Sequence, residues 1–275
     1  MGVKSALSLE EANRLFEGRR FERLEATTDG IIDTTYIARS GATAYILKKY
    51  EEAGRERIEA ERALLERFSR CGITVPSHLA SSGEWHLYSC LKGRKVTQVN
   101  HLHLQSVART LARMHRCTHS GHRPIFDPEE TALQLRRLRA KEYSSYVRLH
   151  RLRDYRPKRE GVIHGDLFTD NALFDGGRIG VIDFIDAGEG SFAFDLGVAA
   201  LDWALRGRNL GYLRRFLRAY NQHAPRKIAL HKLIGEIKNA AAFYTLSRID
   251  KKVRSAAHQK ALLKRTRHLE WSHPC

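Results

Sequence analysis

The sequence predicts an α+β fold in which a β-rich N-terminal region precedes a larger helical region. Three observations carry this prediction. Residues 21–50 and 85–91 have the pattern of short strands. An apolar stripe at helical spacing crosses 55–70, and further helical patterns fill 105–116 and 210–269.

Residues 9–16 suit a short helix, and 43–50 suit a strand that follows a turn. The helix over 55–70 is expected to end at Gly72, since glycine readily adopts the left-handed conformation that closes helices. Its apolar stripe consists of Ile58, Leu64, Leu65 and Phe68.

A hairpin is expected in the C-terminal region, because Asp175-Gly176-Gly177 separates two short apolar runs at 172–174 and 178–182. Two helical stretches, 210–223 and 228–249, follow it. A basic helix over 251–269 is expected to close the chain.

The composition limits the class of protein to which this chain can belong. The 275 residues are 42% hydrophobic and 29% charged, as is usual for soluble globular proteins. No apolar run is long enough to span a membrane, and the N-terminus lacks a signal-peptide core. The four cysteines form no C-x-x-C pair, which predicts reduced thiols rather than a zinc site or a disulfide framework. A cytoplasmic protein is therefore expected.

The net charge of +17 is the unusual global feature. Such a charge favours anionic partners. The basic residues are nevertheless spread over several segments that each suit a solvated helix face, and no nucleic-acid-binding motif accompanies them. We expect a basic surface that leaves weak association with anionic surfaces open, and nucleic acid is not an expected partner.

The segment 162–184 contains the candidate catalytic and metal-binding residues. Val162 and Ile163 suit a buried strand, and four residues separate Asp166 from Asn171. That spacing equals the H-R-D-x-x-x-x-N pattern, in which Asp acts as base and Asn binds the metal. The hairpin is expected to return Asp183 beside Asn171, where both could bind a hard cation such as Mg²⁺. A coincidental or inactive site is the alternative.

His164-Gly165-Asp166-Leu167, with Asn171 and the later Ile182-Asp183-Phe184, resembles the catalytic core of the aminoglycoside phosphotransferase and choline kinase superfamily. Within it, Asp-Leu-Phe-Thr-Asp-Asn is most similar to homoserine kinases of that fold. The resemblance implies a two-lobed protein-kinase-like fold, with an N-lobe over 1–91 and a C-lobe over 92–275. It also implies Asp166 as catalytic base, Asn171 and Asp183 as Mg²⁺ ligands, and ATP as phosphoryl donor.

The resemblance further implies which residues bind the nucleotide. Lys48 matches the strand lysine that contacts phosphates, while Lys49 should point to the opposite face of its strand. Glu61 on the following helix is expected to hold Lys48. Gly30 is the single glycine of the expected nucleotide-covering loop, so no G-x-G-x-x-G cradle is present. The alternatives are a solvated strand lysine and a solvated helix glutamate.

Three further residues are implied by the resemblance. Asp195 should brace the catalytic loop by accepting hydrogen bonds from its backbone, with a helix N-cap as the alternative. His164 is expected to support the same loop. Arg248 lies in a segment similar to the late helix of homoserine kinases, which suggests an acceptor-side residue. His115 is expected to be a packed or capping histidine rather than a catalyst.

The predicted function is therefore an ATP-dependent kinase that phosphorylates a hydroxyl of a small molecule, with homoserine as the best single acceptor. A sugar, a lipopolysaccharide-core sugar, choline or an aminoglycoside are the alternative acceptors. The competing class is a non-catalytic kinase-like module that binds a polyanion through its basic surface.

Overall fold

A computed structural model describes residues 4–27, 32–206, 210–252, 255–267 and 269. The chain forms two compact units. Unit 1 comprises Met1–Arg94 and Gly180–Ile185, and unit 2 comprises Lys95–Ile179 and Asp186–Cys275. The predicted boundary between residues 91 and 92 stays a prediction.

Unit 1 is built on a five-stranded antiparallel sheet with the order β1-β2-β3-β5-β4. Gly41, with a φ of 54°, makes the turn between β2 and β3. The strands are β1 (Arg23–Ala26), β2 (Thr34–Ser40), β3 (Thr43–Lys49), β4 (His78–Ser82) and β5 (Trp85–Ser89).

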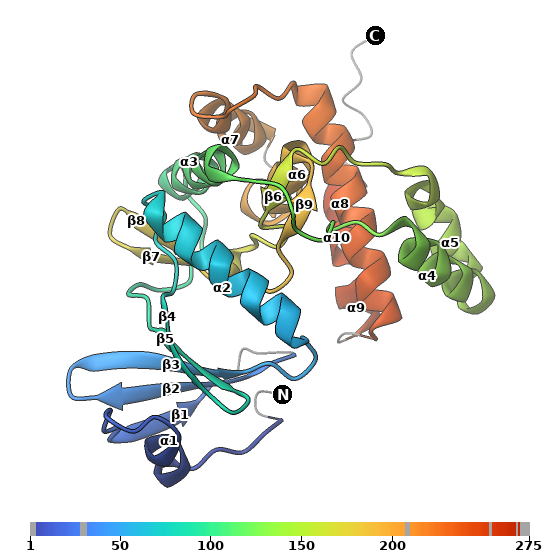
Figure 1. Ribbon diagram of the computed structural model, residues 1–275. Coiled ribbons are helices and arrows are strands. Elements are labelled where there is room, and N and C mark those ends of the chain that lie inside the picture. Colours follow the sequence, from blue (N-terminus) through green and yellow to red (C-terminus); the bar gives the residue numbers. More distant parts are fainter. Residues whose placement is uncertain (1–3, 28–31, 207–209, 253–254, 268, 270–275) are drawn as a thin grey trace. The chain divides into compact units, whose positions relative to one another are not determined.

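Two helices flank this sheet, one on each side (Figure 1). The first, α1 (Leu9–Leu15), begins with a capping box between Ser8 and Glu11 and packs on the face that carries Leu47. The second, α2 (Arg55–Arg70), has the predicted extent and buries Glu61 among its apolar residues. Because side chains alternate along β3, Lys48 lies on the face opposite to Leu47.

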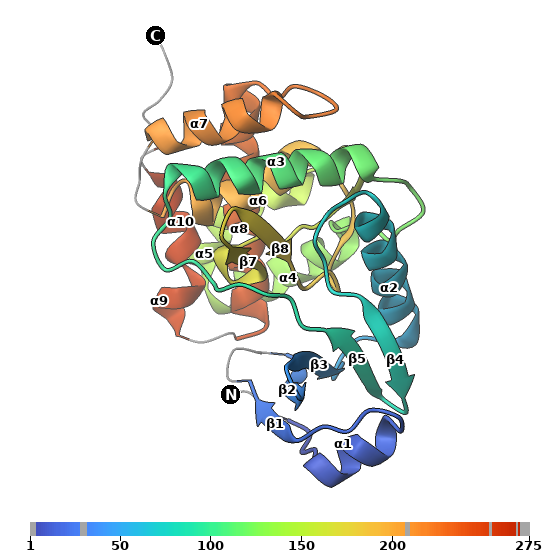
Figure 2. The same cartoon turned by 90° about the vertical axis from the view of Figure 1, so that its left-hand side faces the viewer.

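Unit 2 is mainly helical. Helix α3 packs on α7, and α6 packs on α8 (Figures 1 and 2). Every residue of α6 is buried, which makes it the central helix of the unit. The helices are α3 (His101–Cys117), α4 (Pro128–Lys141), α5 (Tyr143–Leu149), α6 (Phe192–Trp203), α7 (Leu210–Asn221), α8 (Leu230–Asp250), α9 (Ala256–Gln259) and α10 (Ala261–Thr266), with the 3-10 turns η1 (His150–Asp154) and η2 (Thr169–Asn171).

Short strands support the catalytic segment. β6 (Gly161–Ile163) pairs with β9 (Gly188–Gly190), and β7 (Ala172–Asp175) pairs with β8 (Arg178–Val181). The second pair is the predicted hairpin, and Gly176 has a φ of 59° in its turn. The prediction of an antiparallel hairpin in this segment is confirmed.

Two expectations are wrong. The closing helix over 251–269 is instead the short helices α9 and α10, and Lys252 leaves α8 with a left-handed φ of 52°. Cys71 is disulfide-bonded, contrary to the expectation of reduced thiols, whereas Cys90 is a free thiol. Spacing along a sequence does not show which thiols find a partner in the folded chain. No helix within the described residues has both the length and the apolarity of a membrane span.

Candidate active site

The catalytic loop of unit 2 begins where the buried strand β6 ends. Gly165 has a φ of 77°, and a Cβ at this position would lie 2.4 Å from the Ile125 side chain, so only glycine suits the turn. Asp166 follows and is half-buried. Asn171 donates from Nδ2 to the backbone oxygen of Asp166 (2.8 Å) and to its Oδ2 (3.0 Å). The loop therefore joins the predicted base to the predicted metal ligand.

Asp195 holds this loop from the central helix α6. It is fully buried, and its carboxylate accepts hydrogen bonds from the backbone N–H of Gly165 (2.8 Å) and of His164 (3.2 Å). His115 contacts the same carboxylate through Nε2 at 2.9 Å, and its Nδ1 lies 2.7 Å from the Tyr220 hydroxyl. The side chain of His164 in turn accepts from the backbone N–H of Asp166 at 3.1 Å.

The charge state of Asp195 follows from these contacts. Burial alone would raise its pKa, but the hydrogen bond with His115 and those from the loop backbone lower it below the ordinary value. Asp195 is therefore an anion at neutral pH. His115 is buried, as a packed or capping histidine would be, and it contacts the carboxylate that accepts from the loop backbone.

A second brace was not predicted. Asp202 accepts from the backbone N–H of Thr169 at 2.9 Å and from Arg265 Nη1 at 2.7 Å. The neighbouring Trp203 donates from Nε1 to the backbone oxygen of Leu167 at 3.0 Å. The available signal was an aspartate inside an apolar helix, since buried carboxylates are rarely unpaired.

Removal of the Asp195 carboxylate should destabilise unit 2. In Asp195→Ala, the backbone N–H groups of His164 and Gly165 and the ring of His115 lose their acceptor in a buried site. We expect the free energy of unfolding to fall by about 3–5 kcal/mol, as for other broken buried polar networks. Urea unfolding measures this, and Asp170→Ala on the exposed side of the same loop should change it by less than about 0.5 kcal/mol. Equal losses in the two variants would contradict the bracing role.

Helix α8 supplies residues beside Asp166. The Tyr244 hydroxyl donates to the backbone oxygen of Gly165, and its ring meets Phe168 edge-on with centroids 5.1 Å apart. Burial and the Asp166 carboxylate raise the pKa of Tyr244 well above its ordinary value, so the hydroxyl remains protonated. Arg248, one turn further on, lies with its Cζ 5.8 Å from the centre of the Phe168 ring.

Arg248 is a half-buried cation. Burial lowers its pKa while the Asp166 carboxylate raises it, and a guanidinium remains charged throughout the physiological range. Among the described residues, Arg248 forms no ion pair. This side chain can therefore bind an anionic group of an incoming molecule near Asp166.

Unit 1 contains the predicted nucleotide-side residues. Lys48 Nζ lies 3.1 Å from Asp33 Oδ2, 3.5 Å from Asp183 Oδ1 and 4.4 Å from the centre of the Tyr50 ring. Burial lowers the pKa of Lys48, but Asp183, Glu61 and Asp33 outweigh it and raise the pKa above the ordinary value. Lys48 is thus a cation held among carboxylates. Asp33 was not predicted as a site residue.

Glu61 lies in the same unit, with 5% of its surface exposed. Its Oε2 accepts from the Tyr50 hydroxyl, and its Oε1 accepts from the backbone N–H of Phe184 at 3.1 Å. Burial raises the pKa of Glu61. Asp183, directly before Phe184, has a left-handed φ of 66°, a conformation that aspartate and asparagine tolerate better than most residues.

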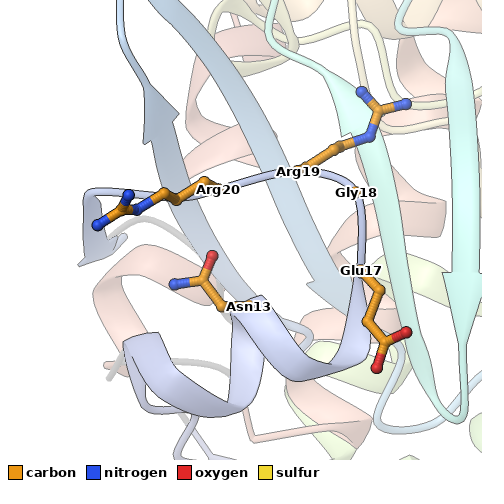
Figure 3. Close-up of a pocket in the computed structure, with 5 residues that line it drawn as sticks. All are labelled: Asn13, Glu17, Gly18, Arg19 and Arg20. Carbon is orange, nitrogen blue, oxygen red and sulfur yellow. The ribbon is translucent and has the colours of Figure 1, made fainter.

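One predicted residue and one surface hollow belong neither to the catalytic-loop residues of unit 2 nor to the nucleotide-side residues of unit 1. Gly30 lies outside the described residues. A hollow beside α1 is lined by Asn13, Glu17, Gly18, Arg19 and Arg20. Figure 3 shows the two arginines extending to opposite sides of the turn, and Asn13 is already bonded to the backbone of Phe21 (2.7 and 3.1 Å). None of the predicted site residues lines this hollow.

Comparison with known proteins decides the class. A model of the phosphotransferase enzyme family matches residues 23–231, which is most of the chain. The chain belongs to this family. The predicted superfamily and enzyme class are therefore confirmed, and the protein is a small-molecule phosphotransferase.

Individual relatives add detail about similarity to this phosphotransferase. A homoserine kinase from Methylobacillus glycogenes is 27% identical over 278 residues, covering 91% of this chain and 87% of the relative. The amicoumacin kinase hAmiN, in complex with AMP-PNP, Ca²⁺ and Ami, has a TM-score of 0.70 at 19% identity and covers 94% of this chain and 91% of that one.

Choline kinase LicA from Streptococcus pneumoniae has a TM-score of 0.69 at 17% identity, covering 94% of this chain and 96% of that one. These structural likenesses confirm the predicted α+β kinase-like fold. The roles of individual site residues stay predictions.

Proposed function

We propose that this phosphotransferase transfers the γ-phosphoryl group of ATP to the hydroxyl of homoserine. The observation that carries the acceptor is Arg248, a half-buried cation beside Asp166 that forms no ion pair among the described residues. Homoserine contains a hydroxyl for transfer and a carboxylate that a guanidinium can bind. The similarity to homoserine kinases supports the same acceptor.

Asp166 is proposed to act on the acceptor hydroxyl. Its Oδ2 accepts from Asn171, and this bond fixes the carboxylate that would take the hydroxyl proton. The hydroxyl oxygen then forms a bond to the γ-phosphorus as the bond from that phosphorus to the β,γ-bridging oxygen breaks. ADP leaves with those electrons, and Asp166 takes the proton. Such transfer depends mainly on positioning and charge stabilisation.

The donor side is proposed to need ATP and Mg²⁺. Asn171 and Asp183 offer two oxygen ligands, which suits Mg²⁺ because that ion keeps several waters and takes others from phosphates. No group of three or more His, Cys, Asp or Glu side chains suited to a metal occurs in the described part of the chain, so an all-protein cage is not the kind of site proposed. The ion would neutralise charge on the phosphates. The similar kinase hAmiN binds AMP-PNP and Ca²⁺.

Lys48 is proposed to contact the phosphates of the nucleotide as a fixed cation. Glu61 is proposed to support this side of the reaction indirectly, since it holds the backbone next to Asp183 through Phe184. His164 and Asp195 support the loop that carries Asp166. We place the reaction in the cytoplasm as a prediction.

The acceptor assignment can be tested with a matched pair of substrates. Arg248→Met keeps an unbranched, flexible side chain and removes the charged guanidinium. We expect kcat/KM for homoserine to fall about 10–100-fold, because a charge-assisted hydrogen bond in a desolvated site contributes about 1.5–3 kcal/mol. For 3-aminopropan-1-ol, which is homoserine without its carboxylate, we expect a change of less than about threefold.

Coupled ADP release measures both substrates, with the exposed Lys251→Met as control. Equal losses for the two alcohols would show that Arg248 does not recognise the carboxylate. Faster turnover of choline, a hexose or kanamycin than of homoserine in the unaltered enzyme would overturn the acceptor itself. Salt-sensitive heparin binding without any turnover would favour the polyanion-binding alternative.

A further inference from the structure

The amino group of Lys48 has a direct carboxylate partner that the sequence did not suggest. Lys48 Nζ lies 3.1 Å from Asp33 Oδ2, and the two side chains are only 15% and 13% exposed. Asp183 is 0.4 Å more distant and its side chain is 45% exposed. The most shielded ion pair of Lys48 is therefore the one with Asp33.

Asp33 is held in place by the backbone. Its Oδ1 accepts from the N–H of Glu51 at 3.2 Å, which leaves Oδ2 directed to Lys48. Thr34, the next residue, bonds to the Glu51 side chain at 2.5 Å. Asp33 precedes β2 and Glu51 follows β3, so the antiparallel pairing of these strands fixes the carboxylate beside the lysine.

Glu61 is occupied differently. One of its oxygens accepts from the Tyr50 hydroxyl and the other from the backbone N–H of Phe184. Among the described contacts Glu61 forms no ion pair with Lys48, although the negative charge of Glu61 raises the pKa of the Lys48 amine. Each oxygen of Glu61 thus already has a donor other than Lys48.

We infer that Asp33 is the positioning residue for Lys48, and that it takes the part that the helix glutamate has in protein kinases. Glu61 instead fixes the backbone beside Asp183. With a metal ion bound, Asp183 would be one of its ligands, and the ion pair with Asp33 would keep the Lys48 amine directed at the nucleotide phosphates. This inference rests on the proposed ATP-dependent function.

A double-mutant cycle on nucleotide binding tests it. The variants are Asp33→Asn, Lys48→Met and their combination, with Glu61→Gln in both Lys48 backgrounds as the matched comparison. Isothermal titration with Mg²⁺ and AMP-PNP gives Kd without any acceptor. Residues that act through one another give non-additive effects, and independent residues give additive ones.

We expect Asp33→Asn to weaken binding about tenfold when Lys48 is present and less than about twofold in the Lys48→Met protein. Glu61→Gln should have the same effect in both backgrounds to within about twofold. Urea unfolding of the ligand-free variants checks that each is folded and repeats the cycle on the ion pair alone.

Equal weakening by Asp33→Asn in the two backgrounds would overturn the inference, since Asp33 would then act independently of Lys48. Tighter binding by Asp33→Asn would overturn it as well, because Asp33 would then compete with the phosphates. Absence of nucleotide binding by the unaltered protein would instead overturn the proposed function, and this inference with it. If the unaltered protein binds the nucleotide but Asp33 and Lys48 show no coupling, the inference is overturned and the proposed function is not.

Discussion

Asp166→Asn should lower kcat by about 10²–10⁴, the range that a positioned general base contributes. Asparagine keeps nearly the same shape and can still accept the hydrogen bond from Asn171, but it cannot take a proton from the acceptor. We expect the KM for ATP to change by less than about threefold, because the substitution removes an interaction made only in the transition state. Coupled ADP release with homoserine measures both constants.

Asp170→Asn is the matched control for this change, since Asp170 is exposed on the same loop. It should leave kcat unaltered. An Asp166→Asn enzyme with kcat close to that of the unaltered protein would rule out Asp166 as the base. If kcat of Asp166→Asn falls and its circular dichroism spectrum also changes, the kcat measurement is repeated with Asp166→Glu. That variant keeps the carboxylate but displaces it.

Asp183→Asn should abolish nearly all turnover, with a loss of about 10³-fold or more, because charge stabilisation by a bound metal supplies several kcal/mol. Asparagine is preferred over alanine here, since residue 183 has a φ of 66° and asparagine tolerates that conformation. The fold should therefore persist while the charged metal ligand is lost.

A titration of activity against Mg²⁺ checks this expectation. The variant should remain inactive at Mg²⁺ concentrations that saturate the unaltered enzyme. Asp175→Asn, at the exposed last residue of β7, serves as the control. Full turnover by Asp183→Asn at saturating Mg²⁺ would remove Asp183 from the metal site.

Local patterns predicted much of the fold. The capped helix α1, the helix α2 and the β7–β8 hairpin each depend on residues close together in sequence, and each was found. Helices α4 and α5 were given no predicted bounds, because the basic residues in this region indicated only that its segments suit a solvated helix face. The closing helix failed where Lys252 adopts a left-handed conformation, which the basic pattern does not reveal.

In the candidate site, too, contacts between residues close in sequence were predicted and contacts between distant residues were not. The spacing of Asp166 and Asn171 is local, and their hydrogen bonds follow from it. The supports of the loop come from distant parts of the chain: His115 reaches Asp195 across 80 residues, and Arg265 reaches Asp202 across 63. Such pairs depend on helix packing, which single-sequence periodicity does not specify.

Asp33 illustrates the limit most clearly. It follows Gly30, the glycine of the expected nucleotide-covering loop, by three positions, and no motif distinguished it from a solvated aspartate. Its approach to Lys48 depends on the register between β2 and β3 and on the bond from Glu51. The partner expected for Lys48 was chosen by resemblance to kinases, whereas tertiary structure supplies another carboxylate.

The most direct test of the central claim is phosphorus NMR of the protein incubated with Mg²⁺, ATP and homoserine, beside Asp166→Asn. The account predicts a new phosphate monoester resonance that grows in step with ADP, couples to the protons on the hydroxyl-bearing carbon of homoserine, and is nearly absent from the variant. Formation of ADP with inorganic phosphate alone, or an equal amount of the ester from Asp166→Asn, would contradict it.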